Sequence, residues 1–181
     1  GTLVSLGRWL PERTVHIRSF SKSHGPDLRL AAIGGAEGPV RAVANRRLLG
    51  AGWTSRILQA VLLTMLTDPV TVQAVRHARD TYAARRAAVC EVLDRSGVNY
   101  TGDDGINLWV AVVNERAAML TLAALGIGVA PGEPFMVGSH DPGAADGRAW
   151  VRVTVGQIPD ASLTAVATAL STASSVPPTW R

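Results

Sequence analysis

The strongest constraint on the fold of this 181-residue chain is one long helical pattern in the middle of its sequence. Asp68 and Pro69 form a typical helix start, and Gly97 is the first residue expected to stop the helix. Apolar side chains recur along it at spacings of three, four or seven residues, at Val75, Ala78, Tyr82, Val89 and Leu93. The helix arginines opposite this stripe are expected to be solvated or to make dimer contacts. A helix this long separates two regions, and we place a domain boundary near Ser96.

The region before the long helix mixes strand and helix patterns. Apolar and polar residues alternate over 14–20, which indicates a strand, and a polar loop follows at 21–26. The remaining expected elements are a strand at 28–33, a helix at 39–49, and a helix that Thr54 or Ser55 caps and that runs to Met65.

The region after the long helix has a similar mixture. We expect strands at 106–113, 127–130 and 150–155, a helix at 115–125 capped by Asn114, and a helix from Asp160 to Leu170. Residues 131–147 are rich in glycine and proline and are expected to form a loop over or beside a site. Strands that alternate with helices favour an α/β or α+β architecture.

Composition excludes several classes of protein. The chain is 47% hydrophobic and 18% charged, which is typical of a folded domain. No apolar run approaches the ~20 residues that cross a bilayer. Cys90 is the only cysteine and no histidine has the spacing of a metal ligand, so we expect neither a disulfide nor a metal site. The formal charge of +4 comes from scattered arginines, so we expect no nucleic-acid binding through this segment.

Lys22 is the only lysine among the 18 lysine and arginine residues. A lysine can become a neutral, nucleophilic amine, whereas an arginine keeps its proton. Ser19, Ser21 and Arg29 lie close to it in sequence, and two hydroxyls with a guanidinium could bind a phosphate group. Taken alone, this pattern is equally typical of an ordinary solvated loop.

Residues 19–30, Ser-Phe-Ser-Lys-Ser-His-Gly-Pro-Asp-Leu-Arg-Leu, resemble the lysine motif of the fold-type I, class I/II aminotransferases. In that family the lysine forms a Schiff base with pyridoxal 5′-phosphate (PLP), and flanking serine and arginine side chains hold the cofactor phosphate. The resemblance implies that Lys22 is the catalytic Schiff-base lysine. It also implies that Arg29 and one or both of Ser19 and Ser21 bind the phosphate.

Three later segments resemble the same family and follow in its order. They are Asp-Gly-Ile-Asn-Leu-Trp-Val at 104–110, Gly-Val-Ala-Pro-Gly-Glu-Pro-Phe at 128–135 and Val-Arg-Val-Thr-Val at 151–155. The arginine of the last segment binds the substrate α-carboxylate in the family. The resemblance implies that Arg152 has this role. Asn107 is a candidate substrate contact and Trp109 is the alternative to it, although packing in the core or at the strand edge would explain both at least as well.

The resemblance implies the C-terminal part of the aspartate aminotransferase-like fold, because the family's lysine lies far from the start of its large domain. Residues 1–96 would complete a partial PLP-binding large domain that includes the long helix. Residues 97–176 would form an α+β small domain, and residues 177–181 a tail. The intact protein is expected to be a cytoplasmic homodimer.

Two functions remain open from the sequence. The first is a PLP-dependent aminotransferase that acts on α-amino acids and 2-oxo acids. The second is the PLP-binding sensor domain of a MocR-type transcriptional regulator of the GntR family, because the motifs look closest to such domains and to their free-standing relatives. A regulator would carry a DNA-binding domain upstream. Both functions use the same lysine and arginines, so this segment does not separate them.

Overall fold

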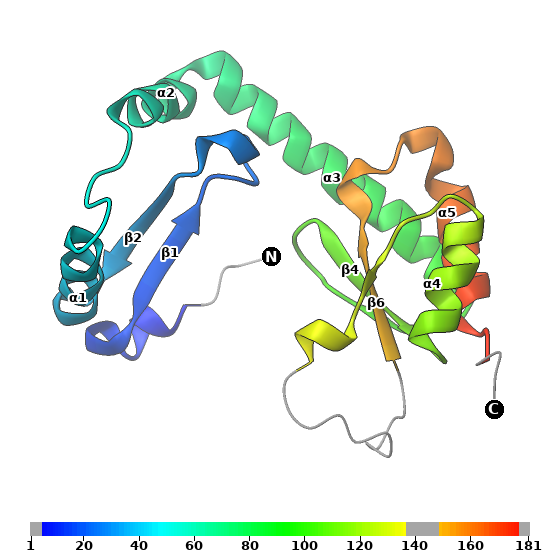
Figure 1. The fold of residues 1–181 in the computed structure, drawn as a ribbon. Helices are drawn as coiled ribbons and strands as arrows, with labels where there is room; N and C mark the ends of the chain where they lie inside the picture. Colours follow the sequence, from blue (N-terminus) through cyan, green and yellow to red (C-terminus); the bar gives the residue numbers. More distant parts are fainter. Residues whose placement is uncertain (1–4, 137–148, 178–181) are drawn as a thin grey trace. The chain divides into compact units, whose positions relative to one another are not determined.

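The computed structural model describes residues 5–136 and 149–177. The chain forms two compact units, Gly1–Ala78 and Arg79–Arg181 (Figure 1). They divide inside the long helix α3 (Pro69–Arg95), whose predicted length is confirmed. The expected domain boundary near residue 96 stays a prediction, and each unit is described separately below.

The first unit is built on a β-hairpin. Strands β1 (Val15–Ser19) and β2 (Ala31–Gly35) pair antiparallel, with Ser19 opposite Ala31. The helices of this unit are the short 3₁₀ turns η1 (Leu6–Arg8), η2 (Pro11–Arg13) and η3 (Pro26–Leu28), followed by α1 (Glu37–Leu48) and α2 (Arg56–Thr67). Ser55 caps α2 by accepting a hydrogen bond from the Leu58 amide, which decides between the two predicted caps.

A small apolar cluster fixes the loop that connects β1 to β2. Its buried members are Phe20, Leu28, Leu30 and Leu62, and Leu58 and Met65 pack against them. Phe20, Leu28 and Leu30 come from the loop, and Leu62 comes from α2 with the partly buried Leu58 and Met65. The loop is therefore anchored on α2 by its apolar residues, while the polar residues between them stay outside the cluster.

Strand β2 begins at Ala31, three residues later than the predicted start at Leu28. Pro26 starts a 3₁₀ turn that runs to Leu28, and Arg29 then adopts a left-handed backbone conformation with φ of 46°. The 3₁₀ turn and the left-handed residue interrupt the extended backbone, so the regular strand starts only after them.

The second unit contains a four-stranded antiparallel sheet with the strand order β3-β4-β6-β5. Its strands are β3 (Tyr100–Thr101), β4 (Asn107–Val112), β5 (Ala130–Pro131) and β6 (Ala149–Thr154). Its other helices are α4 (Glu115–Ala124), α5 (Leu163–Ser174) and the 3₁₀ turns η4 (Glu133–Phe135), η5 (Val155–Gln157) and η6 (Asp160–Ser162). The predicted strands at 106–113 and 150–155 are confirmed, whereas β3 was not predicted and β5 is shorter than expected.

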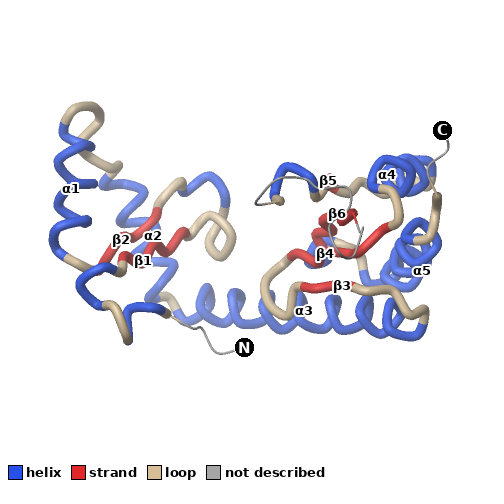
Figure 2. The backbone as a smooth tube through the Cα atoms, turned by 90° about the horizontal axis from the view of Figure 1, so that it is seen from below, coloured by secondary structure: helices blue, strands red, loops and turns tan. Residues whose placement is uncertain are grey.

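One face of this sheet is buried against α4, α5 and the end of α3 (Figure 2). The cluster joins Leu108, Val110, Val151 and Val153 of the sheet to Leu93 of α3, Leu122 of α4 and Leu170 of α5. Alternate residues of β4 and β6 must then face away from the helices. In the pairing, Asn107 lies opposite Thr154, and Trp109 lies opposite Arg152.

Two helix arginines expected in solvent instead bind the second unit's loops. Arg85 donates to an Asp160 carboxylate oxygen and to the Gly156 carbonyl oxygen, both at 2.7 Å. Arg86 donates to the Gly102 carbonyl oxygen at 2.8 Å. Asp160 was predicted to cap the final helix, but it begins η6, and α5 starts at Leu163.

Some predictions fall wholly or partly on residues outside the described ranges. They are most of the loop at 131–147 and all but the first residue of the tail at 177–181. Within the described ranges, no single helix is long and apolar enough to cross a membrane, and only α2 and α3 taken together, bent by 75° between them, meet the length and composition criteria.

The core of the second unit predicts a contrast between two leucines of α4. Leu122 is fully buried and Leu120 is 55% exposed. Leu122→Ala is expected to lower the free energy of unfolding by about 2–5 kcal/mol, because it leaves a cavity. Leu120→Ala is expected to change it by less than about 0.5 kcal/mol. Urea unfolding followed by circular dichroism measures both, and equal losses would contradict this packing.

Candidate functional site

Lys22 lies at the exposed tip of a tight turn that follows β1. The Phe20 carbonyl oxygen accepts hydrogen bonds from the amides of His24 at 2.9 Å and Ser23 at 3.2 Å. The Phe20 amide in turn donates to the Leu30 carbonyl oxygen at 3.0 Å, which closes the base of the loop. The backbone that carries Lys22 is thus fixed by hydrogen bonds and by the burial of Phe20, while its side chain reaches solvent.

The other predicted cofactor-binding residues belong to the same hairpin. Ser19 is the last residue of β1, and its hydroxyl accepts a hydrogen bond from the Ser21 amide at 3.4 Å. Arg29 stands at the far side of the loop, between the buried Leu28 and Leu30. Neither Lys22 nor Arg29 makes a hydrogen bond or ion pair with any described residue. The two cations and two hydroxyls are therefore available to a ligand and have the chemistry that a phosphate group with a reactive carbonyl requires.

His24 has a local structural role in this loop. One ring nitrogen, Nδ1, lies 2.8 Å from the Ser23 hydroxyl, and the ring packs edge-on against Phe20 with 5.7 Å between centroids. These contacts stabilise the turn around Lys22.

Arg152 lies on β6, on the sheet face that the helices do not cover. Its guanidinium carbon is 4.6 Å from the centroid of the Phe135 ring. Phe135 also packs edge-on against Trp109, with 5.3 Å between ring centroids. The Arg152 Nε atom is buried and has no hydrogen-bond partner among the residues that the structure describes. A carboxylate is the ligand that best satisfies a half-buried guanidinium with an uncommitted donor.

Asn107 is near this arginine in the sheet, but its side chain already makes a hydrogen bond within the sheet. Its Oδ1 atom accepts a hydrogen bond from the Thr154 hydroxyl at 2.8 Å, across the β4–β6 pair. This contact favours a role in strand pairing, and a contact from Asn107 to substrate stays a prediction.

Phe135, which packs beside Arg152, was not among the predicted binding residues, whereas Trp109 was considered as the alternative to Asn107. Trp109 and Phe135 both lie in segments that carry the family resemblance, so the sequence motifs could have identified both as candidate binding residues. Lys22, Ser19, Ser21 and Arg29 lie in the first unit, whereas Arg152 and Asn107 lie in the second.

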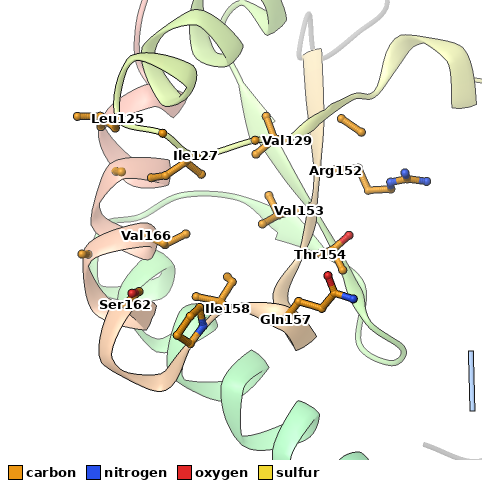
Figure 3. A pocket seen from close by; sticks show the side chains of 16 residues that line it. Leu125, Ile127, Val129, Arg152, Val153, Thr154, Gln157, Ile158, Ser162 and Val166 are labelled. Atoms are coloured by element: carbon orange, nitrogen blue, oxygen red, sulfur yellow. The ribbon is translucent and has the colours of Figure 1, made fainter. Parts of the chain in front are cut away.

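A hollow of about 730 Å³ borders the second unit's sheet, and Arg152 is among its lining residues. Most of its other walls are apolar and include Ile127, Val129, Val153 and Val166. In Figure 3 the Arg152 guanidinium extends away from Val153, on the other side of β6. The apolar walls offer no donor to an anion, so within this hollow only the Arg152 side is a candidate for a carboxylate.

Cys90 and Tyr100 are the described groups whose pKa values rise by burial. Desolvation raises the pKa of the Cys90 thiol, and desolvation with hydrogen bonding to Asp94 and Cys90 raises the pKa of Tyr100. Both groups thus stay neutral near pH 7, which fits the predicted packing role of Cys90. Among the described residues, no group of three or more His, Cys, Asp or Glu side chains could hold a metal ion.

A sequence profile identifies the family, and one curated relative is similar over most of this chain. The sequence profile described as aminotransferase class I and II matches residues 5–170. The vitamin B6 salvage pathway transcriptional repressor PtsJ of Salmonella typhimurium is 31% identical over 172 residues, covering 91% of this chain and 38% of the repressor.

Solved structures with the same fold include two aminotransferases. Thermus thermophilus aspartate aminotransferase with maleate has a TM-score of 0.77 at 21% identity, over 96% of this chain and 44% of that enzyme. The multiple substrate aminotransferase of Thermococcus profundus has a TM-score of 0.73 at 19% identity, over 90% of this chain and 41% of that enzyme. This chain spans less than half the length of these relatives.

The loop that carries Phe135 predicts a strict requirement for glycine at position 132. A Cβ atom there would overlap the Trp150 carbonyl oxygen on β6, whereas a Cβ at Gly128 would meet nothing within 4 Å. Gly132→Ala is expected to cost about 1–3 kcal/mol of stability because backbone must move, and Gly128→Ala is expected to cost much less. Urea unfolding of the two variants checks this, and equal stabilities would contradict the close approach of the loop to β6.

Proposed function

The chain belongs to the class I and II aminotransferase family and has the C-terminal part of the aspartate aminotransferase fold, and on this premise we propose that it is part of a PLP-dependent aminotransferase. Its substrates would be α-amino acids and 2-oxo acids. The observation that carries the proposal is the loop at 19–30, where the only lysine of the chain stands uncommitted on a fixed turn.

We assign cofactor binding to the residues of this loop. Lys22 provides the amine to which PLP attaches, and Arg29 with Ser19 and Ser21 binds the phosphate. The planar guanidinium of Arg29 suits phosphate oxygens, and hydroxyls add single hydrogen bonds. When bound, PLP supplies an electron sink that weakens the bonds at the amino-acid Cα.

The second task of Lys22 is proton transfer. In its neutral form the Nζ atom could take the proton from the substrate Cα. A lysine suits this step because an amine can give up and take back a proton, whereas an arginine stays protonated.

Arg152 is assigned to the substrate carboxylate. Its guanidinium offers a pair of parallel N–H donors, and Phe135 covers one face of it. A ring on that face excludes water and strengthens the attraction between the guanidinium and an anion at its edge.

A specific finding also favours the second candidate, a PLP-binding sensor in a MocR-type regulator. The 31% identical relative from Salmonella is a transcriptional repressor by name. Such a protein could keep Lys22, Arg29 and Arg152 and use them to detect a ligand with little turnover. A cytoplasmic homodimer is part of both proposals.

Turnover separates the two candidates. The complete protein, supplied with PLP, is incubated with a panel of amino acids and 2-oxo acids, and new 2-oxo acid is measured. An aminotransferase is expected to give many turnovers with at least one pair. A signal that stops after one equivalent would reject the aminotransferase and favour the sensor.

The lysine assignment predicts different results for loss of charge and loss of the amine. Lys22→Arg keeps a cation in the loop but has no amine that can attack a carbonyl. We expect Lys22→Ala and Lys22→Arg both to lose the visible absorbance of bound PLP and to bind it at least about tenfold more weakly. An unchanged visible spectrum in Lys22→Arg would overturn the assignment.

The carboxylate assignment predicts a selective loss in Arg152→Lys, which keeps the charge but not the paired donors. Binding of carboxylate substrates is expected to weaken by about tenfold to a hundredfold, while PLP binding is unchanged. The control is Arg8→Lys, since Arg8 lies over the Trp9 ring at 5.9 Å and has no assigned role. Titrations followed by the cofactor absorbance measure both, and equal losses in the two variants would contradict the assignment.

A further inference from the structure

We propose that Glu115 is a positioning residue of the carboxylate site, which acts by fixing the loop that presents Phe135 to Arg152. The inference rests on the proposed role of Arg152. Glu115 was expected only as an early residue of the helix at 115–125, and no motif singled it out.

The contacts of Glu115 lead away from its own helix. It stands in the first turn of α4, where Asn114 already caps the helix by accepting from the Ala117 amide at 2.8 Å. The Glu115 Oε2 atom instead accepts hydrogen bonds from the amides of Gly132 at 2.7 Å and Glu133 at 3.0 Å. One carboxylate oxygen therefore holds two consecutive amides that lie 17 and 18 residues later.

These amides belong to the turn that places Phe135. Within that turn, the Phe135 amide donates to the Gly132 carbonyl oxygen at 2.9 Å, and Pro134 has no amide to donate. The Gly132 amide is shared with the Trp150 carbonyl oxygen of β6 at 2.9 Å. The Glu133 amide donates to the Glu115 carboxylate, so this carboxylate is the side chain that fixes the turn between β5 and Phe135.

The position of the Phe135 ring determines how much of the Arg152 guanidinium is shielded from water. The ring covers the guanidinium at 4.6 Å and also contacts Trp109. If the turn shifts, the ring moves off the guanidinium and water reaches that face, which weakens the binding of an anion. Glu115 therefore sets the affinity of Arg152 for a carboxylate without touching the carboxylate itself.

Three variants separate the hydrogen bonds from the charge. Glu115→Gln keeps an oxygen that can accept from both amides but is neutral. Glu115→Ala removes the acceptor. Glu133→Gln is the matched control, because it removes the same charge from the same turn and leaves the Glu133 amide in place.

The probe is propionate, a carboxylate without an amine, and the readout is the Nε–Hε resonance of Arg152 in the full 181-residue chain. The resonance is identified by its absence in Arg152→Lys. We expect saturable shifts in the unmodified chain, about tenfold weaker binding in Glu115→Ala, and only about twofold weaker binding in Glu115→Gln. Glu133→Gln is expected to bind propionate like the unmodified chain.

A double-variant cycle tests whether Glu115 affects Arg152 through the Phe135 ring. Phe135→Leu is expected to weaken propionate binding by about the same factor as Glu115→Ala, and the double variant to add little further loss. Additive losses of propionate affinity would show that the two residues act independently and would overturn the proposal. If Glu115→Ala does not fold, Glu115→Met replaces it in the cycle, because it keeps the length of the side chain and removes the acceptor.

The outcomes distinguish this inference from the proposed function. If the unmodified chain shows no propionate shift at Arg152, the carboxylate role fails and the inference fails with it. If the unmodified chain binds and Glu115→Ala binds equally well, the inference alone is wrong. A loss of stability without a change in propionate affinity would assign Glu115 a purely structural role and would also overturn it.

Discussion

The arrangement of the second unit depends on the antiparallel register between β4 and β6. With Trp109 opposite Arg152, every second residue of both strands enters the core formed with α3, α4 and α5. The residues between them, including Arg152, must then face the other way. A shift by one residue would bury the guanidinium and expose Val151 and Val153, so the apolar core itself holds the register. The position of Arg152, which we assign to the substrate carboxylate, is thus a consequence of which strand residues are apolar.

Burial of apolar residues also determines the conformation of the loop around Lys22. Phe20, Leu28 and Leu30 are buried against α2, and the polar residues between them have no place in the cluster. The turn at Phe20 and the left-handed conformation of Arg29 follow from the need to bury residues on both sides of a polar segment. A lysine on such a loop is exposed but not freely mobile, which suits a residue that must hold a cofactor at one place.

The sequence predicted the elements with local signals and missed the contacts that cross long distances. The ends of α3, the Asn114 cap and the two central strands follow from periodicity and capping residues, and the family and fold expected from four motifs are confirmed. The bonds of Arg85 and Glu115 join residues far apart in the chain, and no periodicity marks them. The late start of β2 comes from the 3₁₀ turn at Pro26–Leu28 and the left-handed conformation of Arg29, which a non-glycine residue rarely adopts and the alternation of apolar residues does not signal.

The central claim is that Lys22 is the residue to which PLP attaches, and chemical trapping tests it most directly. The protein is mixed with PLP, reduced with borohydride and digested, and the labelled peptide is identified by mass. Because these 181 residues hold a single lysine, a labelled lysine in a peptide from this segment can only be Lys22. The account predicts that the label lies on Lys22. A reduced protein that has bound PLP but carries no label on Lys22 would contradict it.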